Sequence, residues 1–427
     1  MDPGGPRGGP TVVRILRLAA GGDGVAKLED GRIVFVPRTV PGDLAELTSV
    51  RTYARLARAR LGRLLESGPG RIEPRCPHFV GERCGGCQLQ QLSVPAQREA
   101  KRQVVADALG RIGGLNPAVP PLQEAREAWG YRTRITLALG PGRRLAGFHP
   151  VGEAGRVFSL ESCAIARPEL NRLWAALRPR LHLLPVNATT VTLRLDRAGG
   201  LHLLVRVTGQ RVWSRPAALG QALIGADVGT TLWWQPEGGA PRVVHGGGAT
   251  AFPATVFEQV HPELGDRIRH WAVEALGLRS GTRAWDLYAG IGETTRLMAD
   301  RGAEVFSVEL DPRAVEWASR QPGSGKIVRE VGRVEDWVDR LPTPHVVIAN
   351  PPRAGLDARV IAALLRPGAE RLVYVSCDPA TLARDLAGLC RTSSTTEESL
   401  SYRLTGVQPF DLFPQTAHVE TVAVLER

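Results

Sequence analysis

The pattern of apolar and polar positions divides the chain into three regions. Over 11–50, short apolar runs are separated by turns rich in glycine and aspartate, which predicts the strands of a small β-barrel. Over 131–245, apolar and polar positions alternate, which predicts a β-rich region interrupted by one helix at 167–177. From about residue 257, helical periodicity alternates with continuous apolar runs, an order typical of a parallel sheet with helices on both faces.

The third region contains the clearest elements. Strands are predicted at 283–288, 304–309, 345–349 and 371–376, and helices at 262–276, 293–301, 312–319, 356–365 and 380–389. A further helix is predicted at 94–114, where the apolar stripe excludes Arg98, Lys101 and Arg102. We therefore predict an α/β fold that ends in a doubly wound, Rossmann-like domain at 257–427.

Three segments precede that domain. Residues 1–9 are rich in glycine and proline and are expected to be disordered. Residues 10–68 are expected to form an OB-like barrel of five strands. The arginine-rich stretch 51–63, which follows the last predicted strand, favours RNA as its ligand over a barrel without such a role. Residues 69–256 are assigned to the β-rich middle domain.

Composition adds a partner to this picture. The chain has 54 Lys and Arg residues against 43 Asp and Glu residues, a net charge of +11 and a pI near 10.0, which favours nucleic acid as a partner. No apolar run approaches the ~18 residues of a membrane span, and the chain starts without the apolar segment of a secretory signal. We therefore expect a monomeric cytoplasmic protein that binds RNA and no membrane.

A glycine turn and a carboxylate indicate a cofactor site in the third region. Gly290 and Gly292 follow the strand at 283–288 and allow a sharp turn beneath a ligand. Glu309 ends the next strand about 20 residues later, where a carboxylate can accept hydrogen bonds from ribose hydroxyls. Position 295 is Thr, whereas a dinucleotide site has a third glycine there to approach a pyrophosphate. A cofactor without phosphates, such as S-adenosylmethionine, therefore fits better.

Two later strand ends carry candidate reacting groups. They are Asn-Pro-Pro-Arg at 350–353 and Ser-Cys-Asp-Pro at 376–379, and both fall on the ligand-binding edge of a doubly wound sheet. Cys377 lies where a strand becomes a helix, and the helix N-terminus is expected to lower the pKa of its thiol. Cys390 is interpreted as a small buried core residue.

A histidine and a carboxylate follow near the end of the chain. They are His418 and Glu420, in a strand-like segment at 410–421 that is expected to return to the same sheet. The ordered motifs YAGIG, VELD, NPPR, SCDP and FPQTAHVE resemble those of the RNA (uracil-5-)-methyltransferases. The resemblance covers nearly the whole chain, because GDGVAK, VFVP and PGD are similar to the RNA-binding TRAM domain of that family and CGGCQ to its iron–sulfur motif.

The resemblance implies a role for each motif residue. Cys377 would be the nucleophile: its thiolate adds to C6 of uracil, and the resulting enolate attacks the methyl group of S-adenosylmethionine through C5. Glu420 would be the base that removes the C5 proton. The target uracil must be unpaired or flipped out to reach such a site. The implied cofactor-binding residues are Gln259, Tyr288, Gly290, Gly292, Glu293, Glu309 and Asn350.

Two positions depart from the family pattern and leave other functions open. The family usually has Asp at the position of Asn350 and Asn at the position of His261. Asn350 can still accept from uracil N3–H and donate to O4. Asn-Pro-Pro is also typical of methyltransferases that act on nitrogen, but those need no counterpart of Cys377. The alternatives are a tRNA uracil-5 methyltransferase, an RNA-binding protein with lost or altered methyltransferase activity, and a redox protein.

The remaining cysteines predict a metal centre. Cys76, Cys84 and Cys87 have seven and two residues between them, and Cys163 follows at a distance. In a reducing cytoplasm, four thiolates indicate a [4Fe–4S] cluster or a Zn²⁺ ion. His78 is an alternative ligand for zinc, and the resemblance favours the cluster. A chain with both a barrel and a cysteine cluster resembles the enzymes of that family that act on 23S ribosomal RNA more than those that act on transfer RNA.

Overall fold

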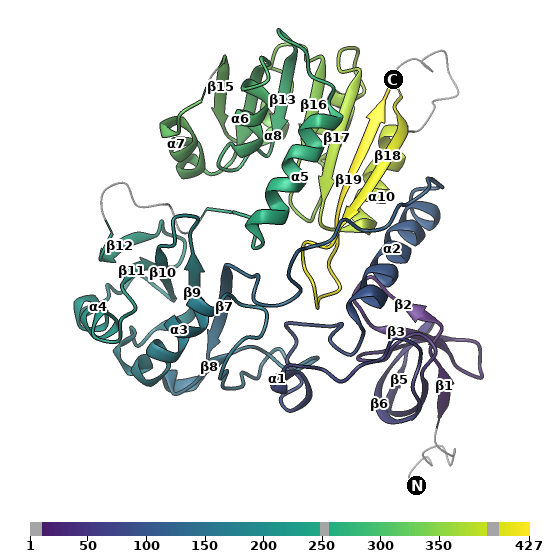
Figure 1. Cartoon of the computed structure of the whole chain (residues 1–427), viewed down its shortest axis with the longest axis vertical. Coiled ribbons are helices and arrows are strands. Elements are labelled where there is room, and N and C mark those ends of the chain that lie inside the picture. The colour runs from purple at the N-terminus through teal and green to yellow at the C-terminus, as the bar shows by residue number, and fades with distance from the viewer. Residues whose placement is uncertain (1–10, 248–255, 324, 391–400) are drawn as a thin grey trace.

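The structure, a computed structural model, describes residues 11–247, 256–323, 325–390 and 401–427 (Figure 1). Its strands form three sheets that follow one another along the chain. The disordered tail expected at 1–9 lies outside the described residues. Within the part that is described, no helix is long and apolar enough to cross a membrane.

The first sheet is a small barrel that closes at a bend. Its strands are β1 (Val12–Arg14), β2 (Arg17–Leu18), β3 (Gly24–Lys27), β4 (Ile33–Val36), β5 (Leu44–Thr52) and β6 (Leu56–Glu66). Their order is β1-β5-β6-β4-β3-β2, so β1 and β2 lie at opposite edges although only Ile15 and Leu16 separate them. The single strand predicted at 11–18 therefore pairs with β5 through one half and with β3 through the other.

The arginine-rich stretch forms part of this barrel and does not follow it. Most of it belongs to β6, which pairs with both β5 and β4. Ala57 and Ala59 are buried, whereas Arg58 between them and Arg60 after them are exposed. This alternation has the period of two of a strand, with alanine in place of the larger apolar residues that usually mark one. The sequence analysis, whose last predicted strand ended at Val50, therefore missed β6 within the barrel that it expected at 10–68.

The second sheet has six strands in the order β12-β11-β10-β9-β7-β8. They are β7 (Arg134–Leu139), β8 (Ala146–Gly147), β9 (Ala188–Leu195), β10 (Leu201–Val207), β11 (Thr230–Gln235) and β12 (Arg242–His245). The helices α3 (Pro168–Leu177) and α4 (Pro216–Ile224) pack on it and share its apolar core. A short helix, α1 (Pro77–Val80), precedes the sheet, and two 3-10 helices, Pro141–Arg143 and Arg178–Leu183, lie within its connections.

The third sheet has seven strands in the order β15-β14-β13-β16-β17-β19-β18. They are β13 (Arg283–Leu287), β14 (Glu304–Glu309), β15 (Ile327–Val331), β16 (Val346–Ala349), β17 (Arg371–Ser376), β18 (Arg403–Phe410) and β19 (Glu420–Glu426). The helices between them are α5 (Pro262–Ala275), α6 (Glu293–Ala299), α7 (Pro312–Arg320), α8 (Val334–Trp337), α9 (Ala358–Leu364) and α10 (Pro379–Cys390). The sheet is parallel except that β19 runs antiparallel to both of its neighbours. The predicted doubly wound domain is confirmed, although the sequence missed β15, α8 and β18.

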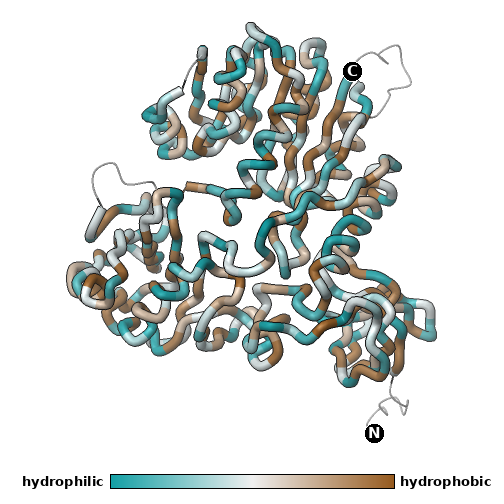
Figure 2. The backbone as a smooth tube through the Cα atoms, viewed as in Figure 1, coloured by the Kyte–Doolittle hydropathy of each residue, from teal (hydrophilic) through white to brown (hydrophobic). Residues whose placement is uncertain are grey.

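Alternate positions along these strands face different helices. Leu372 and Tyr374 of β17 belong to a core cluster with α8, α9 and α10, whereas Val373 and Val375 belong to a cluster with α5 and α6. Both faces of β17 are therefore apolar, and Figure 2 shows brown, hydrophobic segments along the strands of this sheet. This explains why the sequence reads as continuous apolar runs here and alternates in the second sheet.

Helix α2 (Val94–Arg111) lies beside the third sheet in Figure 1, although the sequence assigned its residues to the middle domain. Val105 and Leu109 pack in the same core cluster as α10. Lys101, which the sequence placed off the apolar stripe, is 2% exposed. Its Nζ atom lies 2.6 Å from Oδ1 of Asp411, which is itself fully buried. A distant carboxylate therefore allows this lysine to be buried although it lies off the apolar stripe of the helix.

Candidate active site

The carboxyl ends of β13, β14, β16 and β17 meet at one edge of the third sheet, because these strands are parallel neighbours. After β13 the backbone turns at Tyr288, Gly290 and Gly292, whose φ angles are 64°, 56° and 73°. Gly292 directly precedes α6, where an added Cβ would lie 3.0 Å from Ala318 Cβ. At Gly290 an added Cβ would meet no atom within 4 Å, so this turn borders open space.

Glu309 closes the same turn from the neighbouring strand. Its Oε2 accepts the Gly290 N–H at 2.8 Å and its Oε1 accepts the Asp311 N–H at 2.8 Å. Each carboxylate oxygen has a second lone pair, so the half-buried group keeps acceptor capacity for a ligand. The predicted pairing of the glycine turn with Glu309 is therefore present in the geometry.

A buried carboxyl that the sequence prediction missed supports this turn. Asp286 of β13 accepts a 2.5 Å hydrogen bond from Thr295 Oγ1. Burial, with the charge of Glu309 nearby, raises the pKa of Asp286 to about 7. Its position at the end of a buried strand, just before the glycines, was the signal that could have identified it.

Two further predicted cofactor residues, Gln259 and Glu293, enter from the segment before α5 and from the start of α6. Gln259 is 9% exposed and packs near Gly265 of α5. Glu293 forms ion pairs with Arg197 at 2.9 Å and with Arg269 at 3.1 Å. These arginines come from the second sheet's connections and from α5, so Glu293 joins an ion-pair network between the two sheets in addition to flanking the turn.

Cys377 and Glu420 lie at adjacent positions of neighbouring strands. Cys377 follows Ser376, the last residue of β17, and Ser376 pairs with Thr421 of the antiparallel β19. Glu420 begins β19, so the pairing brings it next to Cys377. The negative charge of Glu420 is one of the causes that raise the pKa of the Cys377 thiol. The structure thus brings the predicted nucleophile and the predicted base together.

The pKa of Cys377 moves opposite to the prediction. Burial raises it, and the nearby Glu420 adds to the rise. The guanidinium of Arg353 acts in the other direction through its charge and a hydrogen bond to the thiol. The helix N-terminus, on which the prediction rested, is occupied by another group, because Asp378 Oδ1 accepts the Thr381 N–H at 2.9 Å.

Glu420 is 2% exposed, and its Oε2 atom has no hydrogen-bond partner among the described residues. Burial raises its pKa to about 8, and the positive charge of Arg353 opposes the rise. A buried acceptor without a partner is costly in a folded protein unless a ligand or water satisfies it. A carboxyl with a pKa near 8 can exchange a proton near neutral pH.

Arg353 lies near the predicted nucleophile and the predicted base and affects the pKa of both, which the sequence analysis did not foresee. Its Nη2 atom lies 3.3 Å from Nε2 of His418, and its backbone carbonyl accepts the Thr381 hydroxyl at 3.0 Å. Burial and the charge of Arg353 lower the pKa of His418 to about 4, so this imidazole is neutral near pH 7. Asn350, three residues before Arg353, is exposed at the same sheet edge, and its N–H donates to Leu287 O at 3.2 Å.

The four predicted metal-ligand cysteines come together far along the chain from Cys377. Cys76, Cys84, Cys87 and Cys163 are buried and line one cavity, together with Arg132 and Leu160. Burial raises the pKa of the Cys84 thiol to about 11 and that of Cys87 to about 12, and the other cysteines add to both. Within the described ranges, no group of three Cys, His, Asp or Glu side chains stands in a metal-coordinating arrangement.

His78, the alternative zinc ligand, has both ring nitrogens engaged. Nδ1 lies 2.9 Å from Glu82 Oε2, and Nε2 accepts the Glu161 N–H at 3.0 Å. Neither nitrogen is directed at a cysteine by these contacts. The structure therefore gives no support to a site of three cysteines and His78.

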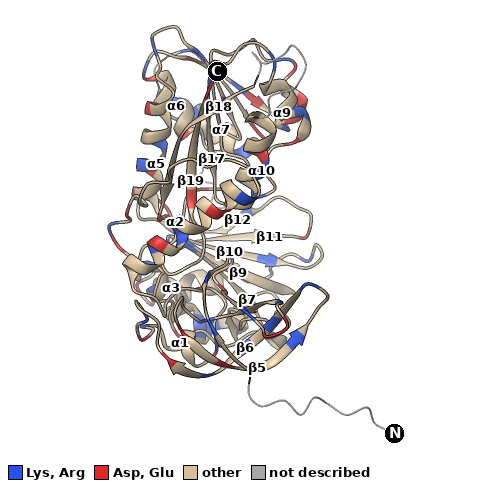
Figure 3. Ribbon diagram, turned by 90° about the vertical axis from the view of Figure 1, so that its right-hand side faces the viewer, with Lys and Arg blue, Asp and Glu red and all other residues tan. Residues whose placement is uncertain are grey.

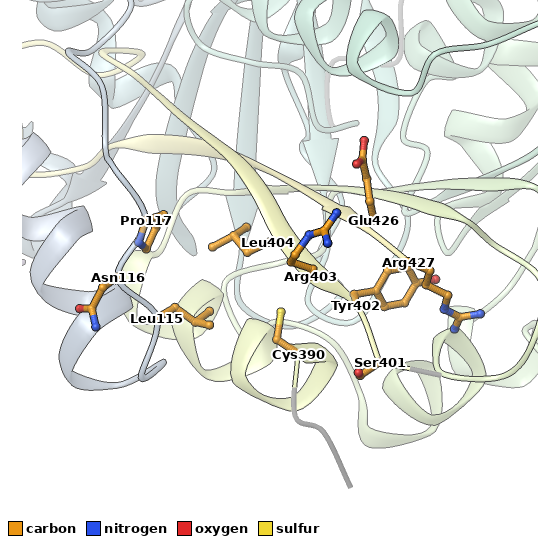
Figure 4. Close-up of a pocket in the computed structure, with 10 residues that line it drawn as sticks. All are labelled: Leu115, Asn116, Pro117, Cys390, Ser401, Tyr402, Arg403, Leu404, Glu426 and Arg427. Carbon is orange, nitrogen blue, oxygen red and sulfur yellow. The ribbon is translucent and has the colours of Figure 1, made fainter. Parts of the chain in front are cut away.

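A separate cavity lies beside β18 and β19, away from the reacting groups (Figure 4). Among its lining residues are Cys390, Tyr402, Arg403 and Arg427. None of the predicted catalytic or cofactor residues lines it. Cys390 is half-buried against the core cluster of α10, which agrees with its interpretation as a core residue.

Comparisons with known proteins agree with this geometry. A family model described as tRNA (Uracil-5-)-methyltransferase matches residues 326–427. An uncharacterized RNA methyltransferase of Thermosynechococcus vestitus is 33% identical, over 98% of this chain and 98% of its own. The 23S rRNA (uracil(1939)-C(5))-methyltransferase RlmD of Thiobacillus denitrificans is 32% identical, over 97% of this chain and 99% of its own.

One solved structure shares the fold along the whole chain. The crystal structure of the Pyrococcus abyssi tRNA (uracil-54, C5)-methyltransferase in complex with S-adenosyl-L-homocysteine superposes with a TM-score of 0.70 at 22% identity. The match covers 97% of this chain and 99% of that chain. The arrangement of the sheets is therefore that of a known protein.

Proposed function

The chain belongs to the family of S-adenosylmethionine-dependent RNA (uracil-5-)-methyltransferases, and from that premise we propose that it methylates C5 of an unpaired uracil through a covalent bond to Cys377. One observation carries the proposal: Cys377 and Glu420 lie next to each other at the sheet edge that also holds the glycine turn. A thiol and a buried carboxyl at this edge are what addition to C6 and proton removal from C5 require.

The glycine turn fits an adenosine cofactor. The space beside Gly290 is open, and Glu309 keeps acceptor capacity for ribose hydroxyls. We assign cofactor binding to Gln259, Tyr288, Gly290, Gly292, Glu293, Glu309 and Asn350. S-adenosylmethionine, when bound there, supplies an electrophilic methyl group on a positively charged sulfur.

The protein residues then act in a fixed order. Cys377 gives its proton to solvent, and its thiolate forms a bond to C6 of the uracil while the C5–C6 π electrons move toward O4 as an enolate. The enolate's C5 takes the methyl group, which leaves a neutral thioether behind. Glu420, in its charged form, removes the proton from C5, and the C6–S bond breaks to release the methylated base and the Cys377 thiolate. The charge of Arg353 stabilises that thiolate before the addition and after the release.

We propose that Cys76, Cys84, Cys87 and Cys163 hold a [4Fe–4S] cluster. Their burial around one cavity and the sulfur-only donor set support this assignment, and the engaged nitrogens of His78 count against a zinc site that uses them. The cluster would brace the segment between the barrel and the second sheet. No step of the methyl transfer passes through it.

We propose 23S ribosomal RNA as the substrate, bound partly by the TRAM-like barrel in the cytoplasm. The similarity to the Thiobacillus denitrificans enzyme along the whole chain supports this choice. Transfer RNA is the second candidate, because the family model and the matched crystal structure are both named for tRNA methylation. Mass mapping of 5-methyluridine in both RNA pools of a deletion strain decides between them.

The covalent mechanism is tested with RNA that contains 5-fluorouracil, whose C5 fluorine a base cannot remove. The wild-type protein is expected to form a stable adduct that survives denaturing electrophoresis. Cys377→Ala is expected to form none and to lose methylation. Cys390→Ala, which changes a half-buried cysteine remote from the site, serves as the matched control and should retain both. Methylation by Cys377→Ala would contradict the covalent mechanism.

A further inference from the structure

The loop that leads into Glu420 is held by residues from the other end of the chain. This C-terminal loop, residues 411–419, connects β18 to β19 and carries His418. Apart from Arg353, which contacts His418, the hydrogen-bond partners that hold this loop lie between residues 88 and 131, in the segment that follows Cys87 and in and after α2. In Figure 1 the loop descends from the third sheet towards this segment.

The centre of the contact is a pair of glutamines. Gln97 of α2 is fully buried, and its amide makes two bonds to Gln415: its Oε1 accepts the Gln415 N–H at 3.0 Å, and its Nε2 donates to Gln415 Oε1 at 2.9 Å. Gln415 has a φ of 69°, a conformation that costs a non-glycine residue energy and persists only where its surroundings enforce it. Gln97 supplies part of that enforcement.

The segment after Cys87 holds the other side of Gln415. The backbone N–H groups of Gln88 and Leu89 both donate to the Gln415 carbonyl, at 3.2 and 3.0 Å. The Gln88 side chain adds a third contact, because its Oε1 accepts the Ala417 N–H at 3.2 Å. At Gln415, three residues before His418, the backbone is therefore bound from both sides.

Two further contacts fix the first half of the loop. Lys101 donates to Asp411 and, at 3.0 Å, to the Phe413 carbonyl. The Tyr131 hydroxyl donates to the Pro414 carbonyl at 3.0 Å. Asp411, Gln415 and Thr416 are each at most 3% exposed, so these bonds replace water that the loop cannot reach.

Cys377 is positioned by different elements. It follows β17, and Asp378 beside it is bound to α10. The contacts on Gln415 and Ala417 therefore position the loop that leads to Glu420, whereas Cys377 is held by β17 and α10. We propose that Gln88 and Gln97 are positioning residues that hold Glu420 in line with C5 of the substrate. This inference rests on the proposed function of Glu420 as the base.

The test separates the two chemical steps in the full-length protein with saturating S-adenosylmethionine. Uracil RNA that carries tritium at C5 reports proton removal by tritium release, and denaturing electrophoresis reports the adduct. In Gln88→Ala and Gln97→Ala we expect tritium release to slow by about 10- to 100-fold, as a small misplacement of a reacting group does. Adduct formation should stay within a few-fold of wild type, so the methylated adduct accumulates.

Gln91→Ala is the matched control. Gln91 is a buried glutamine of the same segment, but its Nε2 reaches the Thr39 carbonyl of the barrel at 3.4 Å. It should leave the ratio of the two rates unchanged. Gln415→Asn provides a second test if Gln97→Ala does not fold. Asparagine tolerates a positive φ, but its side chain is too short to keep the bond that Gln415 Oε1 accepts from Gln97 Nε2.

If Gln88→Ala, Gln97→Ala and Gln415→Asn slow adduct formation and tritium release equally, or leave tritium release unchanged, the positioning role is overturned. If the wild-type protein forms no adduct with 5-fluorouracil RNA, the proposed function fails, and this inference fails with it. A normal wild-type adduct with an unaltered ratio in the variants overturns the positioning role alone.

Discussion

Cys377 and Glu420 both lie where burial disfavours their charged forms. In the proposed mechanism each must nevertheless lose a proton to act, the thiol before the addition and the carboxyl before it removes the C5 proton. Arg353 is the positive charge that opposes both shifts. At the scale of residues, burial raises the pKa of both groups, and the guanidinium of Arg353 lowers both, which favours their charged forms.

Replacement of Arg353 should slow formation of the covalent bond. In Arg353→Gln the thiol loses its charged partner, so its pKa rises further and a smaller fraction is ionised at neutral pH. We expect the rate of adduct formation at pH 7 to fall by about 10-fold or more, which corresponds to a shift of about one pKa unit. The fall should shrink as the pH is raised. A rate that falls equally at pH 7 and pH 9 contradicts a role in ionisation.

Glu420 should also make the folded protein less stable at high pH. Its folded pKa of about 8 lies above the ordinary value of 4.5, so its contribution to stability is full below pH 4.5 and is lost as the pH rises through 8. Between pH 6 and pH 9, the free energy of unfolding of the wild type should fall by about 2 kcal/mol more than that of Glu420→Gln. Urea unfolding at both pH values measures this difference. Asp286, whose pKa is also raised, contributes equally to both proteins and cancels.

At the scale of elements, α2 packs against the third sheet's domain through its apolar face and through the buried ion pair of Lys101 with Asp411. Lys101→Met leaves Asp411 buried without its main partner and should lower the free energy of unfolding by about 3 kcal/mol or more. Arg98, whose Nε atom lies 3.4 Å from Asp411, limits the loss. The double variant with Asp411→Leu should recover much of it, because neither charge is then left alone.

An exposed ion pair on the same helix provides the comparison. Glu99 and Arg102 lie 2.6 Å apart, with the Glu99 side chain 62% exposed. Glu99→Ala should cost less than about 1 kcal/mol, because water screens this pair. Equal losses for Glu99→Ala and Lys101→Met in urea unfolding would show that the buried pair does not bind α2 to the third sheet.

At the scale of the whole molecule, the barrel lies at the end opposite the third sheet, and some of the protein's positive charge lies on it (Figures 1 and 3). Arg51 and Arg55 are exposed where β5 leads into β6. Arg51→Ala with Arg55→Ala should weaken RNA binding and reduce the slope of log affinity against log salt by about 1.5, while the rate with saturating RNA stays unchanged. Arg14→Ala, which removes an arginine paired with Glu66 at 2.8 Å, should change the slope less. Equal slopes in all three proteins would exclude this surface from phosphate contact.

Much of the fold and part of the site could be predicted from local patterns. Apolar runs between helical segments predicted the strands that carry Glu309, Asn350 and Cys377, and parallel strands necessarily end at one edge. No local pattern linked Cys377 to the distant Glu420. Only the resemblance to a known family, through the ordered motifs, predicted that they act together. Boundaries failed where the pattern was weak, as in β6, whose alanines and arginines conceal the alternation.

The sequence by itself determined the order of the elements, the edge at which the reacting groups meet and the four cysteines as a set, because periodicity and motif spacing are local properties of the chain. Only the tertiary structure decided the burial of Lys101 against Asp411, the raised pKa of Cys377 and the contact of Gln97 with Gln415. These features depend on side chains more than 300 residues apart in the sequence or on burial away from water, and no local sequence pattern can reveal either.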